Sequence, residues 1–160
     1  MLDNRKVIID DELLIADTGS AAIDATAAAT VDAVAKVIDT GGGLTKGMFV
    51  VDVASIAGSG QATNCQLIQV ELEGSTTSTF TAWVRLAGFR LGPVAVGHGR
   101  QSADASAASS TTGRYMTPFH NDFHGTVYRW LRVYVTFNGS ANAAVQTPTI
   151  KFKAWLSKLS

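Results

Sequence analysis

Three ionisable residues stand close together in the segment His-Asn-Asp-Phe-His, where His120, Asp122 and His124 occupy alternate positions. Because alternate residues of a strand or turn can converge, imidazole and carboxylate groups at this spacing could bind a metal ion. Such a site needs a further ligand, which His98 or a distant carboxylate would have to supply. No histidine follows His124, so we interpret these residues as ordinary turn residues and predict no metal, no cofactor and no catalytic residue.

Other segments that could carry chemistry lack part of the pattern that the chemistry needs. The glycine-rich segment 41–47 contains Lys46, but not the Gly-Lys-Ser/Thr order with which a phosphate-binding loop places its lysine and hydroxyl. No Gly-x-Ser-x-Gly nucleophile motif occurs. Cys65 is the one cysteine, so no internal disulfide can form, and we interpret it as a small half-buried residue. None of these segments therefore predicts a nucleophile or a phosphate-binding loop.

Two segments alternate with the period of a β-strand. In segment 127–137 one face is apolar apart from a single charged residue, Arg129. Its apolar residues are Val127, Leu131, Val133, Val135 and Phe137. One face of 149–157 is apolar and consists of Ile150, Phe152, Ala154 and Leu156. In both segments the opposite face combines aromatic rings with cations. The apolar faces are expected to cover a core.

Shorter segments of the same kind are predicted as strands at 33–38, 48–56, 65–72, 80–86, 89–96 and 115–120. Segment 20–40 also has apolar residues at helical spacing, but its threonines and valines favour an extended chain that ends in a strand. No helix is predicted after residue 40, and 97–113 is expected to be a long polar loop. The pattern predicts an all-β fold and is typical of a sandwich, a jelly roll or a small barrel. We expect a single-domain jelly roll or β-sandwich at 33–160, preceded by an extended N-terminal arm at 1–32.

Composition limits the functional classes. The chain has 160 residues, 46% of them hydrophobic, and no net charge at neutral pH. It has no apolar run long enough to span a bilayer, and its acidic start does not resemble a signal peptide, so we expect no membrane partner. Residues 1–32 carry seven acids and two bases, whereas 127–160 carry five bases and no acid. The two ends could attract one another or form separately solvated surfaces, and the bases are too few to predict a nucleic-acid partner.

The strand faces opposite the apolar ones predict an interaction surface. Aromatic rings beside cations can stack on sugars or bases, or anchor a protein interface. The alternative is that the same rings fill the second side of a sandwich. The residues expected at the interface, together with apolar residues of the arm, are Trp83, Tyr128, Trp130, Arg132, Lys153, Trp155, Leu13 and Leu14.

Several strand segments resemble, in their order, those of a known family. They are K-V-I-D-T-G at 36–41, M-F-V-V-D-V at 48–53, L-I-Q-V-E-L at 67–72, R-W-L-R-V-Y-V at 129–135 and I-K-F-K-A-W-L at 150–156. Together with the acidic start and the small residues that follow it, they are similar to the capsid cement (decoration) proteins of tailed bacteriophages, in particular the small jelly-roll family. The resemblance does not extend to 97–125.

The resemblance implies a structural role without catalysis. Proteins of this family bind the outside of the capsid, bridge neighbouring major capsid subunits and stabilise the expanded shell, commonly as dimers or trimers. We therefore expect the major capsid protein and further copies of the chain as partners, and a place on the exterior of the virion after synthesis in the host cytoplasm. The alternative is a carbohydrate-binding β-sandwich that uses Trp83, Trp130 or Trp155. A third class, an enzyme, would need a metal at His120 and His124.

Overall fold

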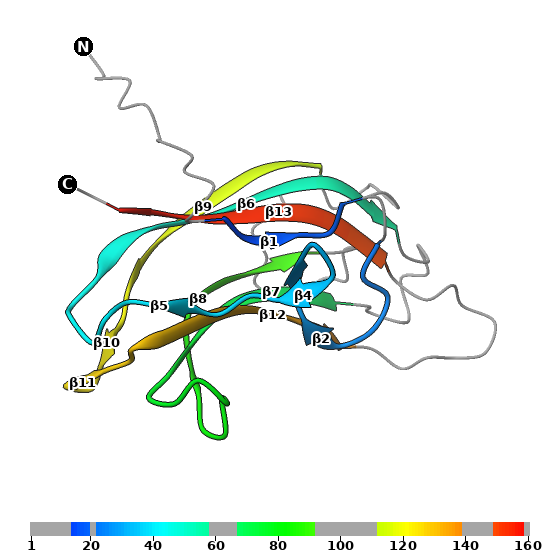
Figure 1. Ribbon diagram of the computed structural model, residues 1–160. Helices are drawn as coiled ribbons and strands as arrows, with labels where there is room; N and C mark the ends of the chain where they lie inside the picture. The colour runs from blue at the N-terminus through cyan, green and yellow to red at the C-terminus, as the bar shows by residue number, and fades with distance from the viewer. Residues whose placement is uncertain (1–13, 20–21, 58–66, 92–111, 139–148, 159–160) are drawn as a thin grey trace, which may run out of the picture.

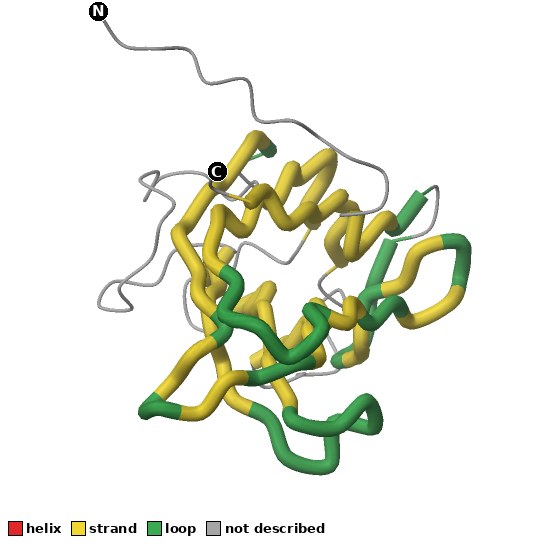
Figure 2. Tube along the Cα trace, turned by 60° about the vertical axis from the view of Figure 1, so that its left-hand side comes forward, coloured by secondary structure: helices red, strands yellow, loops and turns green. Residues whose placement is uncertain are grey.

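A computed structural model describes residues 14–19, 22–57, 67–91, 112–138 and 149–158, and every regular element in them is a β-strand (Figures 1 and 2). The all-β fold is therefore confirmed, and the strands form two facing layers, consistent with a β-sandwich (Figure 1). The described ranges contain no helix that could cross a membrane.

Four antiparallel strands form the first layer, sheet A. In spatial order they are β1 (Leu14–Asp17), β13 (Thr149–Lys158), β6 (Lys46–Ala57) and β9 (Gly113–His120). Leu14 is paired with Trp155, so the first described strand lies beside the last. At the other edge, β9 contains Pro118, which is tolerated in an edge strand where its missing N–H faces solvent.

The second layer, sheet B, consists of β2 (Ala27–Ala28), β12 (Trp130–Asn138), β7 (Leu67–Ser75) and β8 (Val84–Leu91), in that order. A further short strand, β5 (Ile38–Asp39), pairs with the start of β12. Two small hairpins complete the described strands: β3 (Thr30–Val31) with β4 (Val34–Ala35), and β10 (Asp122–Phe123) with β11 (Thr126–Val127).

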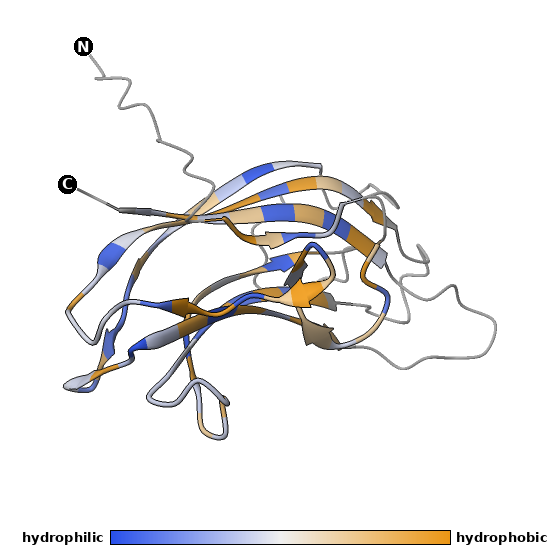
Figure 3. Ribbon diagram, viewed as in Figure 1, coloured by the Kyte–Doolittle hydropathy of each residue, from blue (hydrophilic) through white to orange (hydrophobic). Residues whose placement is uncertain are grey.

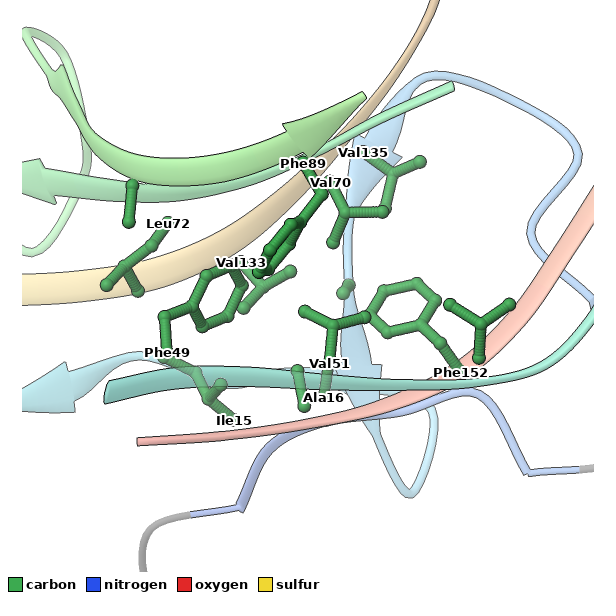
Figure 4. Close-up of a cluster of buried hydrophobic side chains, with 14 of the residues drawn as sticks. Ile15, Ala16, Phe49, Val51, Val70, Leu72, Phe89, Val133, Val135 and Phe152 are labelled. Atoms are coloured by element: carbon green, nitrogen blue, oxygen red, sulfur yellow. The ribbon is translucent and has the colours of Figure 1, made fainter. Parts of the chain in front are cut away.

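The core lies between the two sheets (Figure 4). Alternation puts the apolar residues of each strand on its inner face, and Figure 3 shows this alternation along β13. Phe49 of sheet A stacks on Phe89 of sheet B with ring centroids 5.7 Å apart, so aromatic contact joins the layers directly. Each large apolar side chain buried here contributes about 1.5–3 kcal/mol to stability. The inner faces expected for 127–137 and 149–157 are confirmed from Leu131 and Ile150 onward.

Some expected boundaries are wrong. Segments 80–86 and 89–96 do not form two strands, because residues 80–83 lie in a connection and β8 runs continuously from Val84 to Leu91. Val127 belongs to β11 and is exposed rather than facing the core. Residues 22–40 contain short strands and no helix.

The division at residues 32 and 33 falls in the turn between β3 and β4. Strands on both sides of that turn join the sandwich. On its N-terminal side β1 pairs with β13 and β2 pairs with β12, while on its C-terminal side β5 also pairs with β12. Of the expected arm, residues 1–13 and 20–21 lie outside the described ranges.

Candidate functional site

The outer face of sheet B carries an ion pair between Glu73 of β7 and Arg132 of β12. The two residues are opposite each other in the register, and Arg132 Nε donates to Glu73 Oε2 at 2.7 Å. The Arg132 guanidinium lies 4.3 Å from the ring centroid of Phe80 and 4.8 Å from that of Tyr134. Arg132, expected at an exposed interface, is therefore largely enclosed by the protein's own aromatic rings.

Glu73 is only 1% exposed. Burial raises the pKa of Glu73 above its ordinary value of 4.5, while the hydrogen bond and the charge of Arg132 oppose that rise. The second carboxylate oxygen, Oε1, has no hydrogen-bond partner among the described residues. Glu71, two residues earlier on the same face, is also buried and pairs with Arg85 at 3.1 Å. This face is thus a network of buried charges and not an open polar surface.

The connection between β7 and β8, residues 76–83, lies over this network. Its ends are joined because Ser75 Oγ, which is fully buried, donates to the carbonyl of Ala82 at 2.7 Å. Phe80 is buried against Arg132 although its backbone has a φ of +52°, a left-handed conformation that costs a bulky residue about 1–3 kcal/mol. Trp83 follows at the end of the connection and is 49% exposed. Trp83 is therefore the most exposed of the predicted aromatic interface residues.

Trp155 and Lys153 lie on the outer face of sheet A, on the opposite side of the sandwich from Trp130 and Arg132. Trp155 pairs with Val50 and is only 8% exposed, so the expectation of an exposed Trp155 is wrong. Lys153 Nζ binds Asp17 at 2.9 Å. The predicted interface residues therefore do not form one surface. Leu14 is half-buried in β1, and Leu13 lies outside the described residues.

The loops before β6 and β12 meet at one end of the sandwich, where Asn121 connects them. Its Oδ1 accepts from Thr45 N at 2.7 Å, and its Nδ2 donates to the carbonyls of Gly43 at 2.9 Å and Tyr128 at 3.1 Å. Its backbone N–H donates to the Thr45 carbonyl, and its carbonyl accepts from Tyr128 N. Tyr128, expected at the interface, is thus half-buried beside a fully buried asparagine that fixes both loops.

An ion pair supports the same end. Arg129 donates twice to the carboxylate of Asp39, at 2.7 Å from both Nε and the terminal nitrogen, and its guanidinium lies 5.0 Å from the Trp130 ring. The Arg129 hydrogen bond, followed by one from Gly41 N, lowers the pKa of Asp39 to about 2. The carboxylate raises the pKa of Arg129 in turn. Trp130 is half-buried under this pair.

A cavity of about 120 Å³ opens at this end between the two sheets. Its lining consists of Ile38, Asp39, Thr40, Thr45, Phe119, Leu131 and Leu156. Three exposed apolar side chains belong to the two loops joined by Asn121: Leu44 precedes Thr45 and is 67% exposed, and Phe123 and Val127 project from the β10–β11 hairpin. The loop that carries Leu44 and the hairpin lie together in Figure 1.

His120 and His124 do not converge on an ion site. In the parts of the chain that the structure describes, no three His, Cys, Asp or Glu side chains gather as metal ligands would. His124 lies in the turn between β10 and β11 with a φ of +52°, and its ring meets that of Phe123 at 4.3 Å. His98 and Cys65 lie outside the described residues.

No family model matches the chain, and no curated protein or solved structure does so either. The features that sequence reasoning missed are Asn121, the cavity and the exposed Leu44. The sequence offered a signal for Leu44 alone. This leucine directly follows three glycines in a polar turn, where no strand pattern requires an apolar side chain.

Proposed function

We propose that the protein is a structural virion protein that binds the outside of a phage capsid, bridges neighbouring major capsid subunits and stabilises the expanded shell. The strand segments that resemble jelly-roll capsid cement proteins motivate this function. The observation that carries it is how the charged side chains of the described ranges are used: four ion pairs each link two neighbouring strands, and a fifth joins β5 to Arg129, directly before β12. Side chains paired in this way connect the strands of a scaffold, which suits a protein that bridges two partners.

The exposed features suit contact with another macromolecule. Leu44, Phe123, Val127 and Trp83 are apolar and exposed; Leu44 and Trp83 lie in connections, and Phe123 and Val127 lie in the short β10–β11 hairpin. Contacts of this kind are weak singly, but they add when the same contact is repeated over a symmetric shell. The major capsid protein is the proposed partner.

Two measurements test the proposal. A gene for a major capsid protein next to the gene for this chain would identify the shell to use. Purified protein is then sedimented with expanded and with unexpanded shells of that capsid protein. We expect it to sediment with expanded shells and to raise the temperature at which they disrupt. Binding to neither form would overturn the proposal.

Carbohydrate binding is the second candidate, because Trp83 is exposed beside the threonine-rich connection that covers sheet B. A glycan array with the isolated protein distinguishes the two functions. Specific glycan binding that is lost in Trp83→Ala, without shell binding, would favour this second candidate. Trp155 is excluded from such a site by its burial.

A further inference from the structure

The end of the sandwich around Asn121 carries both an apolar projection and an apolar hole. The projection is Leu44, which is 67% exposed on the loop before β6. The hole is the cavity of about 120 Å³ to which the next residue in the chain, Thr45, contributes. A volume of this size lies between the ~30 Å³ that one water occupies in the liquid and the ~150 Å³ cavity that binds benzene. It has room for one branched aliphatic side chain.

We propose that this end is a self-association surface, at which Leu44 of each copy enters the cavity of a second copy about a two-fold axis. A two-fold contact requires a patch that is complementary to itself, since the same residues meet on both sides. Leu44 and the cavity to which Thr45 contributes satisfy that requirement, because a projecting side chain and a cavity of suitable volume occur on adjacent residues. Phe123 and Val127, exposed on the hairpin that follows Asn121, add apolar surface at the same end of the sandwich.

The charges at this end permit two copies to approach. Asp39 lines the cavity but is neutralised by the bidentate contact with Arg129. Lys46 directly follows Thr45, and Asp122 directly follows Asn121. Each loop therefore has one charged residue at its end, and the charges of Lys46 and Asp122 are opposite in sign. The patch is therefore close to neutral, and a second identical patch brings little like-charge repulsion.

The surface is also pre-organised. Asn121 holds the Leu44 loop through the N–H of Thr45 and the carbonyl of Gly43, and it holds the hairpin end through Tyr128. A loop that is already ordered loses little conformational entropy on binding. Three exposed apolar side chains are few beside the ~800 Å² that each partner buries in a standard interface, so the dimer is weak and forms at high concentration.

Sedimentation equilibrium from micromolar to millimolar concentration tests the proposal. We expect a monomer–dimer equilibrium for the wild type, and Leu44→Ser to raise the dissociation constant at least ~10-fold, as loss of a central anchor does. The matched control is Val34→Ser, because Val34 is 68% exposed on the separate β3–β4 hairpin. It should leave the dissociation constant unchanged. A wild-type protein that stays monomeric at millimolar concentration, or a dimer insensitive to Leu44→Ser, would overturn the proposal.

A second measurement tests the fit of Leu44 in the cavity. In a mixture of isotope-labelled and unlabelled protein, we expect intermolecular nuclear Overhauser effects between the Leu44 methyl groups of one copy and Phe119 or Leu156 of the other. Dimers without these contacts would show that another surface associates. Neither measurement uses shells, so failure here is distinct from failure of shell binding. If the protein is monomeric and Leu44→Ser abolishes shell sedimentation, the cavity end binds the shell subunit and self-docking is wrong.

Discussion

Glu73 is buried to 1% exposure with one carboxylate oxygen, Oε2, bound by Arg132 and the other without a partner among the described residues. Burial favours the protonated form and Arg132 favours the ionised form, and the balance raises the pKa of Glu73 above 4.5. The native state therefore retains this proton to higher pH than the unfolded chain does. It follows that the contribution of Glu73 to stability falls as the pH rises from about 4.5 through the folded pKa.

Substitution Glu73→Gln removes this titration while keeping an acceptor for Arg132. We expect the free energy of unfolding of the variant, relative to the wild type, to increase as the pH is raised from 4.5 to 7. Urea unfolding of both proteins at several pH values in this interval measures the difference. A difference that stays constant, or that moves in favour of the wild type, would show that the buried carboxylate does not titrate as described.

The side chain of Asn121 is buried and fixes two loops with part-buried hydrogen bonds, and truncation to Ala removes its bonds to the Thr45 N–H and to the Gly43 and Tyr128 carbonyls. Each hydrogen bond contributes about 0.5–1.5 kcal/mol net, so we expect Asn121→Ala to destabilise the protein by about 2–4 kcal/mol. Thr126→Ala, an exposed change in the adjoining hairpin, should stay within about 0.5 kcal/mol. Denaturant unfolding monitored by tryptophan fluorescence compares the two. Equal stability of both variants would contradict the assigned role.

At the scale of the elements, close approach of β7 to β8 and to the segment before β12 depends on Gly74. A Cβ built at this position would lie 2.7 Å from Leu86 Cδ1 and 2.9 Å from Tyr128 Cβ. The strands would have to separate to accept it, so we expect Gly74→Ala to lower the free energy of unfolding by about 1–3 kcal/mol. Gly43→Ala, where no atom lies within 4 Å of the added carbon, is the control and should change stability little. Thermal unfolding would refute the packing argument if both variants melted alike.

The longer strands could be predicted because their inner faces repeat every second residue, as β6, β7, β12 and β13 do. The bounds of the strand β8 could not be predicted, because alternation continues through the connection 80–83 and the predicted strands 80–86 and 89–96 left Gly88 between them. In the structure Gly88 is inside the strand, where an added Cβ would lie 2.9 Å from the Val70 carbonyl and 3.2 Å from Arg85 Nε. The glycine thus reports close packing and not a chain reversal.

The candidate site was less predictable than the fold. Alternation along a strand shows which side chains share a face of the sheet, but it does not show which other parts of the chain cover that face. Arg132 alternates to the outer face of sheet B as expected, but Phe80, distant in sequence, folds over it. Trp155 likewise lies on an outer face and is nevertheless buried. Leu44 and Asn121 lie in loops, where no periodicity exists to mark them, and only tertiary contact reveals their roles.

At the scale of the whole molecule, each of the five described ion pairs lies within one sheet: four join two neighbouring strands, and the fifth joins β5 to Arg129, directly before β12. In sheet A they are Asp17–Lys153 and Asp52–Arg114, and in sheet B they are Asp39–Arg129, Glu71–Arg85 and Glu73–Arg132. In the described ranges, cohesion between the sheets comes instead from the apolar core, with Asn121 linking the layers at one end. The two kinds of cohesion should respond differently to solution conditions.

Acid should weaken the pairs within sheets. The Lys153 hydrogen bond lowers the pKa of Asp17, and Arg129 lowers that of Asp39 to about 2. Their stabilisation is complete above the ordinary value of 3.8 and is lost as the pH falls through the lowered values. We expect the stability gap between the wild type and a D17N/D39N variant to be constant above about pH 4 and to close toward about pH 2. Urea midpoints at constant ionic strength measure the gap, and one that persists at pH 2 would contradict the assignment.

Cooling should act on the other kind of cohesion. Attraction between apolar surfaces fades at low temperature, whereas the ladders inside each sheet do not depend on it. During cold denaturation the layers are therefore expected to part before either one frays, beginning at the end remote from Asn121. In supercooled water, amide hydrogen exchange would then show protected ladder amides in β6, β7, β12 and β13 under conditions where the nuclear Overhauser effect between the Phe49 and Phe89 rings is lost.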